Sequence, residues 1–167
     1  MMRLAWILLG LMAGAAVGCA GPVGSGSRPA AVDRVDGVVL ESQPVAIDLD
    51  GKPGADGVRV RLHFYQVDAQ NGLRPVGVLG TVEILLFEGK VQPEAISATK
   101  PFHIWQFTAS QLQQHQGKDN YGLWCYDFVL NWGQHVPSTR GITLSTRYTP
   151  RAGQPIYAPP TTVAMSP

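Results

Sequence analysis

The sequence predicts an all-β domain, a sandwich of two packed β-sheets with one short helix. Four segments alternate apolar and polar side chains, which is the pattern of a strand with one buried and one solvated face. Clusters of Gly, Pro, Asn and Asp separate these segments. The 167-residue chain also has 19 Gly and 13 Pro, too many for a helical bundle, whose interior tolerates neither residue well.

The strongest alternation is at Asp56–Asp68, where every second residue from Val58 to Phe64 is apolar and the residues between them are basic. The other three alternating segments are Gly80–Glu88, 121–132 and 141–148. Weaker strands are expected at 43–48, 102–107 and 155–164. The last of these contains three prolines, so we expect an edge strand or an irregular segment there.

One helix is expected after Thr108. Thr108 at the N-cap and Gln111 three residues later have the spacing of a capping box, and Gly117 marks the expected end of the helix. Turn residues at 50–54, at Asn71-Gly72 and at 133–141 separate the strands. About seven short strands and one short helix over residues 37–167 predict an immunoglobulin-like or transthyretin-like sandwich.

Residues 1–18 have the organisation of a signal peptide. Arg3 supplies a positive charge, and the uncharged run from Leu4 to Val17 is about 14 residues long, short of the roughly 20 that a membrane-spanning helix needs. Cys19 follows, and then a stretch rich in Gly, Pro and Ser. We therefore expect residues 19–36 to be a flexible tether that begins at Cys19.

The segment Ala16-Val17-Gly18-Cys19 resembles the lipobox of bacterial lipoproteins, although Ala16 stands where Leu is usual. The resemblance implies that the Cys19 thiol carries a diacylglyceryl group, that the chain is cut before Cys19, and that the new amino end is acylated. Ala20 in place of Asp implies sorting to the periplasmic face of an outer membrane, where the organism has one. The alternative is an ordinary secretory signal with an incidental cysteine.

The mature chain is expected to be neutral. Loss of Arg3 from the 13 Lys+Arg leaves 12 against 12 Asp+Glu. A neutral chain lacks the basic footprint of a nucleic-acid-binding protein and has no electrostatic preference for anionic lipid. The expected partners are therefore the membrane, through the lipid on Cys19, and an envelope protein, with a glycan as the alternative.

Three carboxylates lie close together in the sequence, at Asp48, Asp50 and Asp56, among turn-forming glycines. Closely spaced carboxylates suit calcium, but Lys52 and Arg59 stand where an EF-hand loop counted from Asp48 needs oxygen ligands. We interpret the segment as a polar connection whose Asp and Gly residues serve turn chemistry. Calcium binding is the alternative.

Cys125 is the only thiol outside the expected anchor. His115, His135 and Asp127 are near it in the sequence, as a catalytic thiol would require, but no Gly-rich turn or helix start exposes it. We interpret Cys125 as a buried, inert side chain. Because the aromatic residues of 121–132 define the opposite face, partial exposure of Cys125 is the alternative.

No metal, cofactor or catalytic residue is predicted. The four histidines, His63, His103, His115 and His135, lack zinc-ligand spacing, and the sequence contains no dinucleotide-binding, P-loop, nucleophile-elbow or metalloprotease motif.

The aromatic run 121–132 is interpreted as core, since its rings alternate on one face. Trp105 and Trp132, near strand ends, are the better candidates for exposed rings that could stack on a glycan.

Three short motifs in the domain resemble envelope β-sandwich proteins of planctomycete-type bacteria, a group with no established activity to carry over: Asp56-Gly-Val-Arg-Val60, Trp105-Gln-Phe107 and Thr146-Arg-Tyr148. The pattern V-R-V-R-x-x-x-Y at 58–65 also resembles the transthyretin-like lipoprotein of type VI secretion.

The favoured interpretation is a membrane-anchored envelope lipoprotein that acts as a non-enzymatic binding or assembly module. The alternatives are a glycan-binding module, a type VI secretion-like lipoprotein, and an enzyme with a dispersed site around Cys125 and the histidines.

Overall fold

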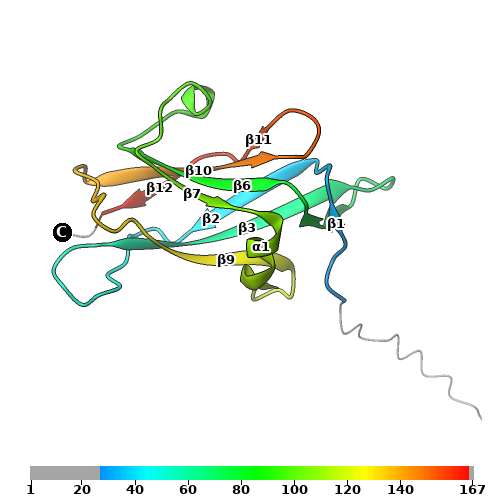
Figure 1. The fold of residues 1–167 in the computed structure, drawn as a ribbon, viewed down its shortest axis with the longest axis horizontal. Helices are drawn as coiled ribbons and strands as arrows, with labels where there is room; N and C mark the ends of the chain where they lie inside the picture. Colours follow the sequence, from blue (N-terminus) through cyan, green and yellow to red (C-terminus); the bar gives the residue numbers. More distant parts are fainter. Residues whose placement is uncertain (1–26, 166–167) are drawn as a thin grey trace, which may run out of the picture.

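The computed structural model describes residues 27–165, and these form two β-sheets packed face to face (Figure 1). The first sheet contains β2 (Gly37–Ser42), β3 (Gly57–Val67), β4 (Leu73–Pro75), β8 (Gln116–Lys118) and β9 (Trp124–Asn131). Its order is β2-β3-β9-β8, and β4 pairs with the end of β3 that β9 leaves free. The all-β sandwich expected from the sequence is confirmed.

The second sheet contains β6 (Thr81–Glu88), β7 (His103–Phe107), β10 (Gly141–Thr149), β11 (Ile156–Tyr157) and β12 (Thr161–Ala164). Its order is β11-β10-β6-β7, and β12 pairs with β10 on the same edge as β11. Beside the sheets, β1 (Ala31–Val32) pairs in parallel with β5 (Gly77–Val78). The helical segments are η1 (Pro93–Ala95), α1 (Ala109–Leu112) and η2 (Gln113–His115).

The core lies between the sheets, where the alternating positions of the long strands meet. The inward side chains of β3, from Val58 to Phe64, are fully buried, as the alternation predicts, and those of β6 and β10 face them across the sandwich. Burial of each such side chain contributes about 1.5–3 kcal/mol to folding. A smaller apolar cluster of Leu85, Phe87 and Ile96 lies on the outer face of the second sheet, under the β6–β7 connection.

Three aromatic rings join the two sheets. Phe64 on β3 makes edge-to-face contacts with Tyr126 on β9, at 5.8 Å, and with Tyr148 on β10, at 5.5 Å between ring centroids. The Tyr148 hydroxyl donates a 2.7 Å hydrogen bond to the carbonyl of Asp33 and accepts one from the Gly80 amide. Gly80 has to be glycine, because a Cβ there would collide with the backbone carbonyl of Thr149.

The N-terminal part of the described chain is attached to one end of the sandwich (Figure 1). Val35 is buried, and the Asp33 carboxylate accepts hydrogen bonds from the amides of Arg151 and Ala152. The tether expected over residues 19–36 therefore does not reach residue 36, because residues 31–36 already pack on the domain. The apolar side chains of Ala31, Val32 and Val35 distinguish this stretch from the Gly- and Ser-rich residues before it.

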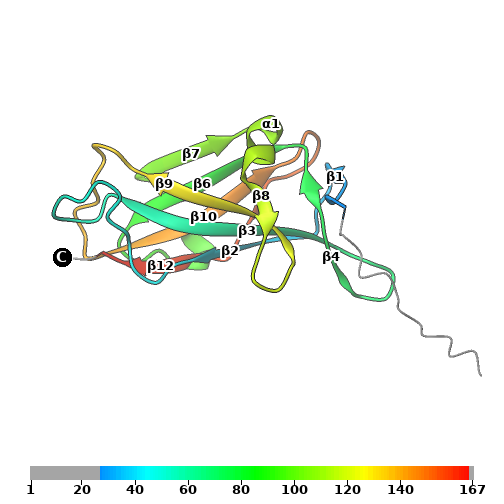
Figure 2. The same cartoon turned by 90° about the horizontal axis from the view of Figure 1, so that it is seen from below.

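The two long sides of the sandwich are closed differently. On the β2 side the sheets share backbone hydrogen bonds, from Ala46 N to the Ala164 carbonyl at 2.8 Å and from Ala164 N to the Pro44 carbonyl at 2.9 Å. On the β7 side α1 inserts the buried Leu112, and the Trp105 indole donates to the Asn131 carbonyl at 2.9 Å (Figure 2).

The expected strands at Asp56–Asp68, Gly80–Glu88, 121–132, 141–148 and 102–107 match β3, β6, β9, β10 and β7 to within about three residues. The strand expected at 43–48 is wrong: only isolated bridges occur there, at Val45 and Ile47, and the strand is β2, at 37–42. Its alternation was hidden because the outward residue Val39 is apolar. The proline-rich segment 155–164 forms the two short edge strands β11 and β12.

The capping box expected at Thr108 and Gln111 is confirmed, with both side chains bonded to the backbone of the first turn. The helical segment consists of α1 and η2, and it ends at His115, before Gly117, as expected; Gly117 itself belongs to β8. Within residues 27–165 no helix has the length and apolar composition to cross a bilayer. The expected signal peptide 1–18 and Cys19 lie outside the described residues.

Tyr148→Phe tests the contribution of the hydroxyl that joins β10, Gly80 and Asp33. We expect the free energy of unfolding to fall by about 1–2 kcal/mol, because the buried Gly80 amide and the Asp33 carbonyl both lose their partner. Urea denaturation followed by circular dichroism measures the change. Tyr121→Phe, whose ring is exposed, is the matched control, and equal midpoints for the two variants would contradict this role.

Candidate functional site

The three carboxylates of the β2–β3 connection converge, with ligand oxygens of Asp48, Asp50 and Asp56 within 4.8 Å of one another. All three are already engaged. The Asp48 carboxylate accepts hydrogen bonds from the backbone amides of Asp50 and Gly51, and the Asp56 carboxylate accepts one from the amide of Leu49. The Lys52 ammonium lies 2.8 Å from Asp50 Oδ2, and this hydrogen bond lowers the pKa of the Asp50 carboxyl. Backbone amides and the Lys52 ammonium therefore already engage all three carboxylates.

Cys125 lies on the outer face of the first sheet, as its position in the alternation predicts, yet it is only 2% exposed. The interpretation of Cys125 as a buried side chain is confirmed, and the alternative of partial exposure is wrong. Burial raises the pKa of the Cys125 thiol; the nearby Arg61 opposes this rise, and the carboxylates of Asp119 and Asp127 add to it. A buried thiol whose neutral form is favoured is a poor nucleophile.

The histidines near Cys125 in the sequence contact other groups. His115 stacks on Phe128 at 4.4 Å between ring centroids, and its Nδ1 lies 3.2 Å from the Asp127 carbonyl oxygen. His135 packs against His103 at 5.3 Å between ring centroids. Each imidazole thus packs against another ring, and neither contact involves the thiol.

A groove lies on the outer face of the first sheet, between the β3–β4 hairpin and the β8–β9 loop, which project from the same face (Figure 2). We call it the outer groove; it has a volume of about 320 Å³. Its apolar lining is Val39, Tyr65, Leu73, Pro75, Tyr121, Leu123 and Trp124. Its polar lining is Glu41, His63 and Asp119.

An aspartate fixes each wall of the outer groove. In the β8–β9 loop Asp119 Oδ1 accepts the amides of Tyr121 and Leu123, both at 2.8 Å, and this turn leaves the Tyr121 side chain 88% exposed. In the hairpin Asp68 Oδ1 accepts the amide of Gly72 at 2.7 Å. Both walls are tight turns set by side chain to backbone hydrogen bonds, so the groove is formed before any ligand binds.

The turn at Asn71-Gly72, expected from the sequence, is confirmed, and Asn71 adopts the left-handed conformation with φ +60°. The Lys118 ammonium lies 5.1 Å from the centre of the Trp124 ring and packs against one of its faces. The lining residues come from four separate strands, β2, β3, β4 and β9, and from the β8–β9 loop, so the sequence alone contained no signal that they meet.

A charged extension continues from the outer groove along the same sheet face, and the two share Glu41. It is lined by Arg59, Arg61, Asn120 and Asp127, among others, and has a volume of about 350 Å³. Arg61 and Asp127 are cross-strand partners whose side chains form an ion pair at 3.3 Å. The ion pair thus links β3 to β9 on the outer face of the first sheet.

The two tryptophans expected to be exposed are not the exposed aromatic residues. Trp132 is only 1% exposed and belongs to the core, so that expectation is wrong. Trp105 is half-buried and packs against the core. The exposed aromatic side chain of the outer groove is instead Tyr121, and Trp124, which lines the same groove, is half-buried like Trp105.

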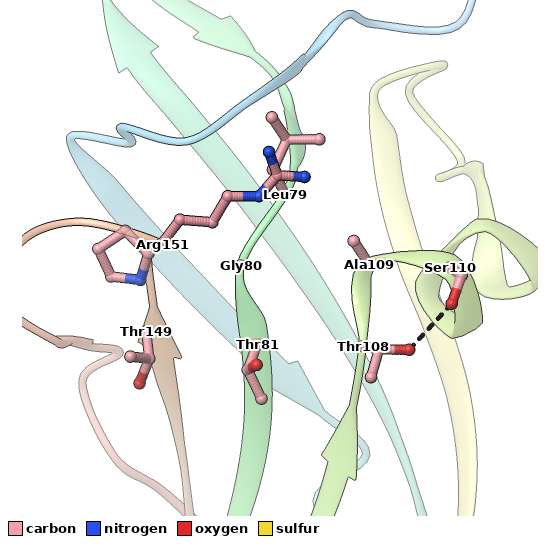
Figure 3. A pocket seen from close by; sticks show the side chains of 9 residues that line it. Leu79, Gly80, Thr81, Thr108, Ala109, Ser110, Thr149 and Arg151 are labelled. Atoms are coloured by element: carbon pink, nitrogen blue, oxygen red, sulfur yellow. Dashed lines mark hydrogen bonds between the residues drawn. The ribbon is translucent and has the colours of Figure 1, made fainter.

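A second hollow lies at the end of the sandwich where the N-terminal segment is attached (Figure 3). Hydroxyl side chains from β6, β10 and the start of α1 line it, together with Arg151. Thr108 and Ser110 are hydrogen-bonded to each other at 3.0 Å, and the Thr108 hydroxyl also caps α1. These hydroxyls serve the helix start, which makes the hollow a weaker candidate than the outer groove.

Comparisons with known proteins give no match: no family model fits the chain, and neither the curated proteins nor the solved structures contain a significant relative. We therefore infer the function from the residues and the geometry. The outer groove, with its aromatic wall and partly charged floor, is the candidate functional site.

Calcium is expected to leave the protein unchanged, because Asp50 pairs with the Lys52 ammonium and the Asp48 and Asp56 carboxylates already accept hydrogen bonds from backbone amides. The melting temperature should stay the same when millimolar calcium is added. Lys52→Ala is the matched variant, since only there are the carboxylates without their cation. A calcium-dependent rise of the melting temperature in the unmodified protein would contradict the interpretation.

Cys125 is expected to be unreactive in the folded protein. In a full-length Cys19→Ala variant, the Cys125 thiol should alkylate about a hundredfold more slowly in buffer than in urea, because it is buried and its pKa is raised. Val129→Cys places a thiol at an exposed position of the same strand face and should react at once. Rapid labelling of Cys125 in buffer would show that the thiol is accessible.

Proposed function

We propose that this protein is a lipid-anchored binding or assembly module of the cell envelope, without enzymatic activity, and that the outer groove is its binding face. The lipobox-like segment ending at Cys19 supports the anchor. The groove supports the binding role, because concave, mostly apolar surfaces with a few convergent polar groups are the usual form of ligand sites.

The observation that carries the proposal is the placement of exposed apolar side chains on rigid turns. Leu73 and Tyr121 are among the most exposed large apolar side chains of the described residues, and they stand on opposite walls of one groove. A soluble domain gains nothing in stability from such exposure. Because aspartates hold both walls, little conformational freedom is lost when a ligand is bound.

The position of the N-terminal segment is compatible with presentation from a membrane. Residues 20–30 lie between Cys19 and the docked segment that starts at Ala31. A Gly/Ser-rich coil of about 11 residues spans roughly 17–20 Å root-mean-square. Under the proposal, this stretch joins the domain that carries the outer groove to the membrane.

The charged groups support a binding role over a hydrolytic or transfer role. Arg61 pairs with Asp127, and Arg147 pairs with Glu83 on the outer face of the second sheet. The candidate nucleophile Cys125 is buried, and its pKa is raised. The two ion pairs link neighbouring strands, and the thiol is not available as a nucleophile. The proposal therefore assigns the binding role to the outer groove.

Growth of expressing cells with labelled palmitate tests the anchor. We expect the protein to take up label and to fractionate with membranes, whereas Cys19→Ala should be unlabelled and soluble, since the thiol is the attachment point. Cys125→Ala, which removes the other cysteine, is the control and should remain labelled. An unlabelled, soluble wild-type protein would refute the lipid anchor.

A further inference from the structure

The walls of the outer groove present aromatic side chains in a form suited to a ring-shaped ligand. Tyr121 stands at the tip of its turn, and Trp124 and Tyr65 lie in the same groove. Tyr and Trp offer a large apolar surface with a polar tip, and they lose little side-chain entropy on binding because they have only two rotatable bonds. The fixed turn at Asp119 reduces that loss further.

The floor of the same groove contains polar atoms that lack a partner. His63 Nε2 is buried and has no hydrogen-bond partner among the described residues; Glu41 Oε2, at 3.7 Å, is too far for a hydrogen bond. Arg61 Nε, in the adjoining charged extension, is also buried and has no hydrogen-bond partner among the described residues. The Glu41 side chain remains more than half exposed. A ligand hydroxyl could donate to Glu41 and, after a small movement, accept from His63.

Apolar rings beside unpaired donors and an exposed carboxylate match the chemistry of a sugar. A pyranose has a face of C–H groups that stacks on an aromatic ring and a rim of hydroxyls that both donate and accept hydrogen bonds. We propose that the outer groove binds an oligosaccharide, with one pyranose ring against Tyr121 and Trp124 and its hydroxyls toward Glu41 and His63. This inference rests on the proposed function of the same groove and names its ligand class.

Other occupants fit the groove less well. β3 runs beneath the groove and is paired with β2 on one side and with β9 and β4 on the other, so a peptide strand could not add to β3 in the floor of the groove. A lipid chain would cover the apolar wall but leave His63 Nε2 in the floor unpaired. An oligosaccharide provides both the stacking face and the hydrogen bonds.

The test is a titration of the purified full-length protein, in a detergent without a sugar headgroup. The probes are the tetrasaccharides of N-acetylglucosamine, glucose in α-1,4 linkage and glucose in β-1,4 linkage, and a disaccharide-peptide fragment of peptidoglycan. Calorimetry and tryptophan fluorescence report binding. We expect saturable binding of at least one probe, and we expect Tyr121→Ala to weaken it about tenfold or more, as stacking on an exposed ring requires.

Matched variants separate binding from folding. Val129→Ala lies on the same face of β9 but outside the groove and should change the affinity less than about twofold. Tyr121→Phe keeps the aromatic ring and should retain most of the affinity. His63→Phe should weaken binding, but the tryptophan fluorescence should still change when the sugar is bound, because stacking is kept. Equal effects of Tyr121→Ala and Val129→Ala would overturn the proposal.

The remaining outcomes are equally decisive. If none of the four probes binds at millimolar concentration, the groove is not an oligosaccharide site. If instead sedimentation shows self-association that Tyr121→Ala abolishes, the groove docks a second copy and the proposal fails. The palmitate experiment is independent of both results, since a labelled protein that binds no sugar keeps the anchor and loses only this ligand assignment.

Discussion

The contact between Phe64 and its two tyrosine neighbours is the interaction on which the rest of the structure depends. It joins the middle of the first sheet to β10 of the second, and it also places two phenolic hydroxyls at one end of the core. Tyr126 accepts the amide of Val78, and Tyr148 connects Gly80 with Asp33. The same rings that fill the core therefore fix where β6 begins and where the N-terminal segment is attached.

The candidate site depends on this core only indirectly, through the strands that carry its loops. The sandwich supplies a sheet face, and short turns after β3 and before β9, which antiparallel pairing places at the same end of the sheet, raise its rim. In both turns one aspartate carboxylate binds backbone amides, at Asp68 and at Asp119. The β2–β3 connection uses the same chemistry at Asp48. Aspartates at these three positions thus shape the loops that carry them.

The sequence was sufficient for features that depend on local pattern. The inward residues of β3, the capping box at Thr108 and the turn at Asn71 follow from alternation and from side-chain geometry within a few residues. Exposure was harder to predict, because it depends on what covers a residue. Trp132, although near a strand end, is covered by the opposite sheet, and Cys125 is buried on the outer face.

The candidate site could not be predicted for the same reason. Tyr65, Leu73 and Trp124 meet only because β4 and the β8–β9 loop approach the same sheet face, and no local spacing encodes that meeting. Val39 was misleading in another way. Its apolar side chain on the outward face of β2 obscured the strand, and it is that outward position which places Val39 in the groove lining.

The unequal closure of the two sides of the sandwich has a mechanical consequence. Along β2 the sheets are fastened by main-chain hydrogen bonds around Ala164, whereas along β7 the described contacts between them are side-chain contacts, led by the Trp105 indole and Leu112 of α1. The β7 side can therefore separate without the loss of a ladder bond, and transient opening of the domain should start there. The outer groove lies on the sheet whose long strands β2, β3 and β9 stay paired in such a fluctuation, so its shape would be preserved while the opposite sheet moves.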